Sequence, residues 1–367
     1  EIPEVVFLRC QKGMAGMNGV SQIPSQSHTK AAAAIFTLVG FVTLPSILNL
    51  PAAGIDQSWI IGLNMAMERG LQFGKDIVFT FGPLGFMWSP TLCYPDLWIT
   101  AAIVTAVVHI IFVFLIVLMA VRHGATMRDY VLLSVVLLLS LYEVSLDCRL
   151  TLCAVILLYL AMTSRFKSKF SLTAALLSAA VFTAAASLVK FTQAIVGVWM
   201  LCVAAGVFIR RKQAYGWVTL LIAYPASALF LWILCGQRIG NIPAYIRNSY
   251  EIAAGYNVAM QLHENGMYVL LAAVTAGFWV ILLWAAARAK EANLGLLLLI
   301  GLGFVGMNYK YAAVRSDIIH IRDFTAGGLI VYSLMLLPLR EAGNRLARMR
   351  AAAYICTAML ALAAATA

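Results

Sequence analysis

Charged side chains are scarce in this sequence: Asp, Glu, Lys and Arg make up 11% of its 367 residues, whereas apolar residues make up 63%. About a quarter of a soluble globular chain is charged, so the composition excludes that class. The sequence also has no P-loop, GxSxG, HExxH or dinucleotide-binding motif, and its seven cysteines show no metal-ligand spacing. The enzyme classes that depend on these motifs are excluded as well.

In contrast to its few charged residues, the sequence has many long apolar runs, and its mean hydropathy is +0.90. Runs of about 17–25 residues are long enough to cross a bilayer core as a helix. No internal repeat is visible, which argues against a transporter built from repeated halves. We predict an all-α polytopic transmembrane helical bundle with about eleven spans, at residues 31–50, 97–121, 130–146, 150–164, 171–189, 191–209, 216–235, 267–287, 293–309, 324–339 and 351–367.

The 26 Lys and Arg residues are divided unevenly between the two sides of the predicted spans. Seventeen fall on the side of residues 1–30 and nine on the other side. Because basic residues collect in cytoplasmic loops, we predict a multi-pass protein of the plasma (inner) membrane with a cytoplasmic N-terminal segment at 1–30. No basic patch is interleaved with exposed aromatic residues, so the expected partner is the lipid bilayer and no nucleic acid is expected.

The transmembrane domain is predicted over 31–367, and the chain stops inside an apolar run, which indicates a missing C-terminal part. The cytoplasmic links are short, whereas the outer side has loops at 51–96, 240–266 and 308–324. Long ordered loops are often functional. We therefore expect the chemistry on the outer face of the membrane.

The first outer loop places two carboxylates, Asp56 and Asp76, beside the membrane surface. A carboxyl group in such a place can have its pKa raised toward that of a general base. The alternative is that Asp56 only caps a helix that runs to about Arg69 and ends at Gly70. Further along, Pro83 in the stretch FGPLGF predicts a turn, which the flanking aromatic residues would anchor at the membrane interface.

Two other places hold candidates for binding an anionic group. The loop 308–324 contributes Arg315, Asp317, His320 and Arg322. A guanidinium binds a phosphate through two parallel hydrogen bonds, and Arg315 and Arg322 would share a face if one helix continued through both. The alternative is that they only reach toward lipid headgroups. Lys190, between two apolar runs, is either the tip of a helical hairpin or a partly buried cation that faces a cavity.

Residues 31–100 resemble a known family. An Asp just after the first predicted span is followed by an amphipathic helix and by the pattern G-x-x-x-G-x-D-x-x-F-T-x-x-P-L at 70–84. Over residues 31–100 this resembles the GT-C superfamily of membrane glycosyltransferases, which includes protein O-mannosyltransferases and lipid A aminoarabinose transferases. The resemblance implies an inverting transfer of a sugar from a polyprenyl-phosphate carrier to an acceptor on the outer face. It implies that Asp56 is the catalytic base. If Asp56 is only a helix cap, Asp76 is our next candidate for the base.

The implied partner is a polyprenyl-phosphate-linked sugar donor, whose phosphate Arg315 or Arg322 would hold. The acceptor and the cofactor stay open. A divalent metal ion is one candidate cofactor, although Gln57 stands where many family members have a second acidic residue. The alternatives to a glycosyltransferase are a polysaccharide polymerase or ligase of the outer face, and a lipid-linked-sugar transporter or flippase.

Overall fold

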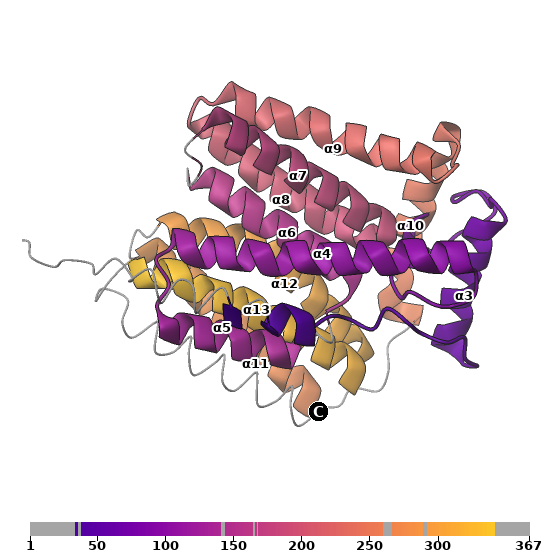
Figure 1. Cartoon of the computed structure of the whole chain (residues 1–367), viewed down its shortest axis with the longest axis horizontal. Coiled ribbons are helices and arrows are strands. Elements are labelled where there is room, and N and C mark those ends of the chain that lie inside the picture. The colour runs from indigo at the N-terminus through magenta and orange to yellow at the C-terminus, as the bar shows by residue number, and fades with distance from the viewer. Residues whose placement is uncertain are drawn as a thin grey trace, which may run out of the picture.

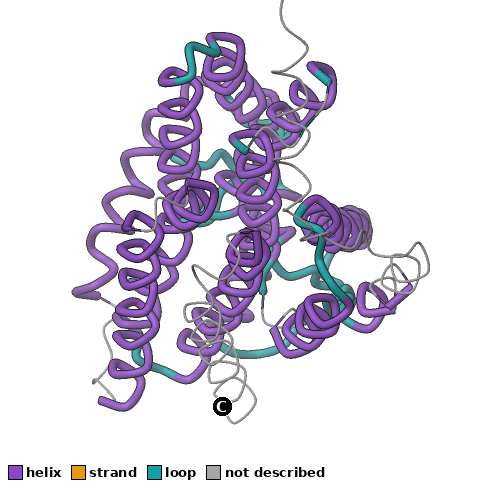
Figure 2. Tube along the Cα trace, turned by 90° about the vertical axis from the view of Figure 1, so that its left-hand side faces the viewer, coloured by secondary structure: helices purple, strands orange, loops and turns teal. Residues whose placement is uncertain are grey.

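The computed structural model describes residues 34–35, 38–140, 144–163, 166, 168–259, 266–288 and 292–341. These residues form helices joined by loops (Figure 2), which confirms the predicted all-α class. In chain order the helices are α3 (Ile55–Glu68), the 3-10 helix η1 (Gly85–Met87), α4 (Pro95–Arg122), α5 (Met127–Ser140), α6 (Leu146–Met162), α7 (Lys169–Val189), α8 (Phe191–Arg210), α9 (Ala214–Leu234), the 3-10 helix η2 (Ile239–Asn241), α10 (Ile242–Ala259), α11 (Gly266–Arg288), α12 (Ala292–Arg315) and α13 (Ile318–Glu341).

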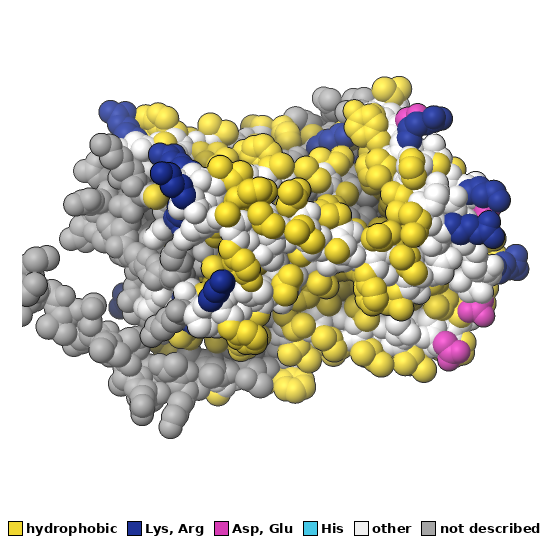
Figure 3. All heavy atoms as spheres, turned by 90° about the horizontal axis from the view of Figure 1, so that it is seen from above, with side chains coloured by type: hydrophobic (Ala, Val, Ile, Leu, Met, Phe, Trp, Pro, Cys, Tyr) yellow, Lys and Arg dark blue, Asp and Glu magenta, His cyan; other side chains and the backbone are white. Residues whose placement is uncertain are grey.

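The long helices run alongside one another as a bundle (Figure 1), and α6 lies in its interior. α6 packs against α4, α7, α8 and α12, and all of its residues except Cys148 are buried. A helix that is apolar nearly all round is typical of such an interior. On the surface, Figure 3 shows a band of hydrophobic side chains between two ends that carry Lys and Arg. This is the surface expected of a bundle that crosses a bilayer.

Among the described residues, five helices are long and apolar enough to span a membrane: α4, α7, α8, α9 and α12. The chain is therefore a multi-pass helical membrane protein by length and composition, but the prediction of eleven spans is wrong. Five predicted spans correspond to these helices: 97–121, 171–189, 191–209, 216–235 and 293–309. The predicted spans 267–287 and 324–339 lie in α11 and α13, which are not among the five. The segment 1–30 and the span 351–367 lie outside the described residues.

Three further predicted spans fail for physical reasons. In 31–50, the described chain leaves the helix at Thr43 and Pro45 prevents its continuation. In 130–146, residues 141–143 lie outside the described residues, and the described helix α5 has 14 residues and is about 21 Å long, shorter than a bilayer core of about 30 Å. In 150–164, the apolar run belongs to α6, which has 17 residues and is about 26 Å long, also shorter than the bilayer core.

The predicted outer loop 51–96 folds into a cap over one end of the bundle. Within it, α3 lies crosswise to α4 (Figure 1), and its Leu63 and Ala66 are buried. These side chains belong to an apolar cluster that also contains residues at the ends of α6, α7, α8 and α9, including Leu146, Leu188, Phe191 and Trp232. The helix predicted to end near Arg69 and Gly70 does so, and it packs on the bundle.

The stretch FGPLGF, residues 81–86, joins this cap to the bundle. All six residues are buried. The backbone N–H groups of Gly82 and Leu84 donate to the carbonyls of Val189 (3.2 Å) and Leu188 (3.1 Å) at the end of α7. The predicted turn is thus paired with the end of α7 through backbone hydrogen bonds. A Cβ atom on Gly82 would lie 2.4 Å from the Leu188 carbonyl oxygen, so the close approach requires glycine.

Replacing Gly82 by Ala is therefore expected to destabilise the protein. The added methyl group must displace the backbone of α7, and such overpacking costs about 1–3 kcal/mol. Thermal unfolding in detergent, followed by tryptophan fluorescence, measures the effect. Gly62→Ala in α3 is the matched control, since a Cβ there meets nothing within 4 Å and Ala is favoured over Gly in a helix. Equal unfolding temperatures for the two variants would show that the close packing of the turn is not essential.

Candidate functional site

The link between α12 and α13 contains most of the residues predicted to bind an anion. The predicted loop 308–324 is largely helical, because α12 continues to Arg315 and α13 begins at Ile318. Ser316 between them has a left-handed backbone (φ 45°). Arg315 and Arg322 therefore lie on different helices, and the expectation that one continuing helix aligns them is wrong.

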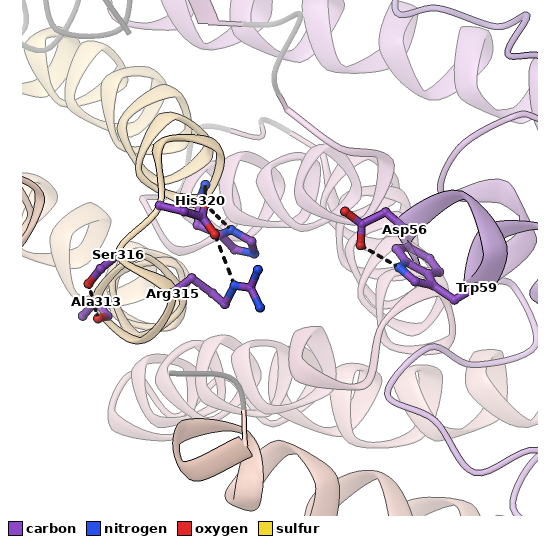
Figure 4. A network of polar contacts seen from close by, with 7 residues as sticks. Asp56, Trp59, Ala313, Arg315, Ser316 and His320 are labelled. Carbon is purple, nitrogen blue, oxygen red and sulfur yellow. Dashed lines mark hydrogen bonds and ion pairs between the residues drawn. The ribbon is translucent and has the colours of Figure 1, made fainter. Parts of the chain in front are cut away.

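Asp317 lies in this link. Its carboxylate contacts both the guanidinium of Arg315 and the imidazole of His320. Its Oδ2 accepts a hydrogen bond from Arg315 Nε (3.2 Å). Its Oδ1 accepts one from the His320 backbone N–H (2.9 Å) and lies 2.7 Å from His320 Nδ1. Figure 4 shows Arg315 and His320 side by side at the end of their helices. We call Arg315, Asp317 and His320 the Asp317 clamp.

The Asp317 clamp leaves the outer nitrogen atoms of both Arg315 and His320 unused. Among the described residues, neither the two Nη atoms of Arg315 nor Nε2 of His320 has a hydrogen-bond partner. Burial by itself raises the pKa of Asp317, but the hydrogen bonds from His320 and Arg315 outweigh it and lower the pKa below its ordinary value. Asp317 thus stays ionised and holds both partners in one geometry.

Lys190 lies next to the Asp317 clamp, in the one-residue link between α7 and α8. Its Nζ is 4.6 Å from the centroid of the Tyr311 ring and 5.4 Å from that of Phe81. Within the described part of the chain, Nζ has no hydrogen-bond or ion-pair partner. Burial lowers the pKa of Lys190, yet the acidic groups around it, first Tyr311 and then Asp147, raise it above the ordinary value. Lys190 is thus both the tip of the hairpin and a charged, partly buried cation.

Tyr256 of α10 connects Lys190 with the Asp317 clamp. Its ring lies edge-on to Tyr311 of α12, with centroids 5.8 Å apart. Burial raises the pKa of Tyr256, whereas the positive charges of Arg315 and Lys190 act to lower it. Both cations are therefore close enough to act on one phenol. Lys310 of α12 does not contribute here, because its Nζ donates to the Ala253 carbonyl (3.1 Å) and fastens α10 to α12.

Asp147 is a buried carboxylate near Lys190 that our sequence analysis did not select. Its side chain is 1% exposed. Oδ2 accepts a hydrogen bond from Gln193 Nε2 (3.0 Å), and Gln193 Oε1 accepts one from Thr151 (2.9 Å). A charged residue inside an apolar helix is itself a functional signal. Asp147 is close enough to Lys190 to raise the pKa of that lysine.

Asp56 does not cap α3. The N-cap residue is Gly54, which makes no side-chain hydrogen bond, and Asp56 lies within the first turn. Its Oδ1 accepts a hydrogen bond from Trp59 Nε1 (3.1 Å). Figure 4 shows the Asp56 carboxylate turned toward the region where Arg315 and His320 lie. The carboxylate is exposed, so its second oxygen is accessible to a ligand.

An aromatic cluster connects Asp56 to Lys190. The Trp59 ring packs against Phe81, with centroids 4.7 Å apart, and Phe81 in turn lies under Lys190. Phe79 and Trp88 complete the cluster, at 5.9 Å and 5.3 Å from Trp59.

The two remaining predicted site residues, Asp76 and Arg322, lie outside the Asp317 clamp. Asp76 is exposed in the turn after α3, where its Oδ2 accepts a hydrogen bond from the Gln72 backbone N–H (2.9 Å). The Asp76 side chain therefore stabilises the turn that contains it. Arg322 is half-buried on α13, one turn beyond the Asp317 clamp. No group of three His, Cys, Asp or Glu side chains in the described part of the chain is arranged to hold a metal ion.

Comparisons with protein-family models, with curated proteins and with solved structures find no match to this chain.

Proposed function

We propose that this protein is a membrane glycosyltransferase of the GT-C kind. It would transfer a sugar from a polyprenyl-phosphate carrier to an acceptor on the extracytoplasmic face of the inner membrane. The observation that supports this most is the Asp317 clamp, which presents unused donors of Arg315 and His320 at the same end of the bundle as Asp56 and Lys190.

The carrier's chemistry fits this end of the molecule. Its isoprenoid tail stays in lipid, against the hydrophobic surface of the bundle, and its phosphate reaches polar groups at the helix ends. The two Nη groups of Arg315 match two phosphate oxygens, and the Lys190 ammonium adds a second positive charge. Asp56 then accepts the proton of the acceptor hydroxyl as its oxygen attacks the anomeric carbon. The carrier phosphate leaves from the opposite side, so the anomeric centre is inverted.

The distribution of charge supports the extracytoplasmic orientation. Basic residues collect on the cytoplasmic side of membrane proteins. The helices α4 and α8 lead from the candidate site to Arg122 and Arg210 in their last turns, so these basic ends lie on the side opposite the site.

The test uses the protein in proteoliposomes with a panel of polyprenyl-phosphate hexoses and amino sugars. We expect time-dependent release of free polyprenyl phosphate, and faster release when sugar or lipid-linked acceptors are added. Protein-free liposomes are the control. Movement of the labelled lipid between leaflets without release of polyprenyl phosphate would instead indicate a flippase, and no binding of any polyprenyl phosphate would overturn the proposed donor.

A further inference from the structure

We propose that His320 is a general acid that protonates the departing carrier phosphate, with Asp317 as the residue that positions it. This inference rests on the proposed function and extends it to the leaving-group side of the reaction. The sequence predicted only that His320 binds the substrate.

The geometry of the Asp317 clamp restricts the His320 ring to one orientation. Oδ1 of Asp317 contacts both the backbone N–H and Nδ1 of His320, at 2.9 Å and 2.7 Å. A hydrogen bond at Nδ1 determines the tautomer and directs Nε2 away from the carboxylate. A helix cap alone would need only the backbone contact. The ring contact is therefore additional to capping α13.

Only His320 among these cations can give up a proton near neutral pH. A guanidinium such as Arg315 stays protonated in proteins. Lys190 is held in its charged form by the acidic groups around it. Imidazoles titrate between about pH 5 and about pH 8, so an imidazolium can hydrogen-bond to the phosphate and then transfer its proton.

The proton balance of the step is complete. The acceptor oxygen forms a bond to the anomeric carbon, and its proton passes to Asp56. The bond between the anomeric carbon and the phosphate oxygen breaks, and its electron pair goes to that oxygen. The proton on Nε2 of His320 transfers to the resulting phosphate dianion, which leaves as a monoanion. One proton is taken up by Asp56 and one is released by His320.

Charged and titratable groups lie around His320 on more than one helix. Arg315 is at the end of α12, and Asp317 is in the link before α13. On the α10 side lies Tyr256, whose pKa is affected by the charges of both Arg315 and Asp317. Arg322 and Asp323 follow on α13 itself. Within the described residues, no hydrogen bond or ion pair joins His320 to a titratable group of α4, α5 or α11, which also pack against α13.

The first experiment measures binding of a polyprenyl methyl phosphodiester to the purified protein in nanodiscs, from about pH 5 to about pH 9. This probe carries one fixed negative charge, so its own titration does not interfere. We expect the affinity of the parent protein to fall roughly tenfold or more as the pH rises, because a charge-assisted hydrogen bond is lost. His320→Gln should bind equally weakly across the range. Asp317→Asn keeps a capping side chain but should move the loss of affinity to lower pH, since the imidazolium loses its carboxylate.

The second measurement is the rate of polyprenyl phosphate release. His320→Gln should lower kcat by about 10²–10⁴-fold, with a smaller change in KM. Exposed Arg247 of α10, changed to Gln, is the matched control and should retain the parent's pH profile.

The outcomes separate this inference from the proposed function. A parent protein that binds the phosphodiester equally at all pH values, or a His320→Gln variant that keeps the parent's kcat, would overturn the role of His320 and leave the carrier as donor. An unshifted profile for Asp317→Asn would remove the positioning role. Failure of the parent protein to bind the probe at any pH would instead contradict the proposed function itself.

Discussion

Asp56→Asn is expected to abolish sugar transfer while leaving the fold and donor binding intact. The amide oxygen of Asn can still accept the Trp59 hydrogen bond, so the local contact survives. The amide cannot take the proton of the acceptor hydroxyl, and loss of a general base costs about 10²–10⁴-fold in rate. The measurement is the initial rate of polyprenyl phosphate release in proteoliposomes, with donor affinity determined on the same preparation.

Trp59→Phe provides the matched comparison for this variant. It keeps an aromatic ring against Phe81 and removes only the indole N–H that holds the carboxylate. We expect it to retain most of the activity, because Asp56 keeps its charge. If Asp56→Asn transfers sugar at the parent's rate, the base is elsewhere, and loss of activity in Asp76→Asn would identify Asp76.

Arg315→Lys is expected to weaken use of the donor and to leave the acceptor unaffected. Lysine supplies a point charge in place of the guanidinium fork and cannot reproduce the Nε contact to Asp317. Loss of a charged hydrogen bond to the phosphate costs about 1.5–3 kcal/mol, so KM for the lipid-linked sugar should rise about 10- to 150-fold. Steady-state rates at varied donor and varied acceptor concentrations distinguish the two effects.

The same substitution at Arg247 is the control for Arg315→Lys. Arg247 is a surface residue of α10, and its side chain is 79% exposed in an ion pair with Glu251, where the charge contributes little. Arg247→Lys should leave both KM values unchanged. A normal donor KM for Arg315→Lys, in a protein with normal thermal unfolding, would mean that Arg315 only ties Asp317 to α12. The carrier phosphate would then have to be sought near Lys190.

The spans were predictable where a run of apolar residues was long enough to form one helix across the bilayer. α4 and α9 are such helices, and their predicted bounds differ from the observed ones by at most two residues. The prediction failed for α6, because its apolar run lies in a helix of 17 residues, about 26 Å long, which is shorter than the bilayer core. It also failed after Thr43, where the apolar run continues but Pro45 stops the helix.

The candidate site was predictable in composition but not in arrangement. From their residue types, Arg315, Asp317 and His320 were predicted to belong to one anion-binding group. The structure shows Asp317 in direct contact with the other two. Their separation into two helices depends on Ser316, whose left-handed conformation has no clear signal in the sequence. Sequence reasoning also offered capping as a task for Asp56, whereas the structure directs its carboxylate to Trp59.

The sequence by itself determined that this protein is helical and membrane-bound, because apolar run length and the scarcity of charge follow directly from the solvent that the chain occupies. It also determined which side chains can carry charge at the helix ends. Only the tertiary structure decided which residues of other helices these charged side chains contact. Lys190 of the α7–α8 link reaches Tyr311 of α12, while Asp147 of α6 binds Gln193 of α8. Such contacts depend on how helices far apart in the chain pack against one another, and local sequence patterns do not encode that packing.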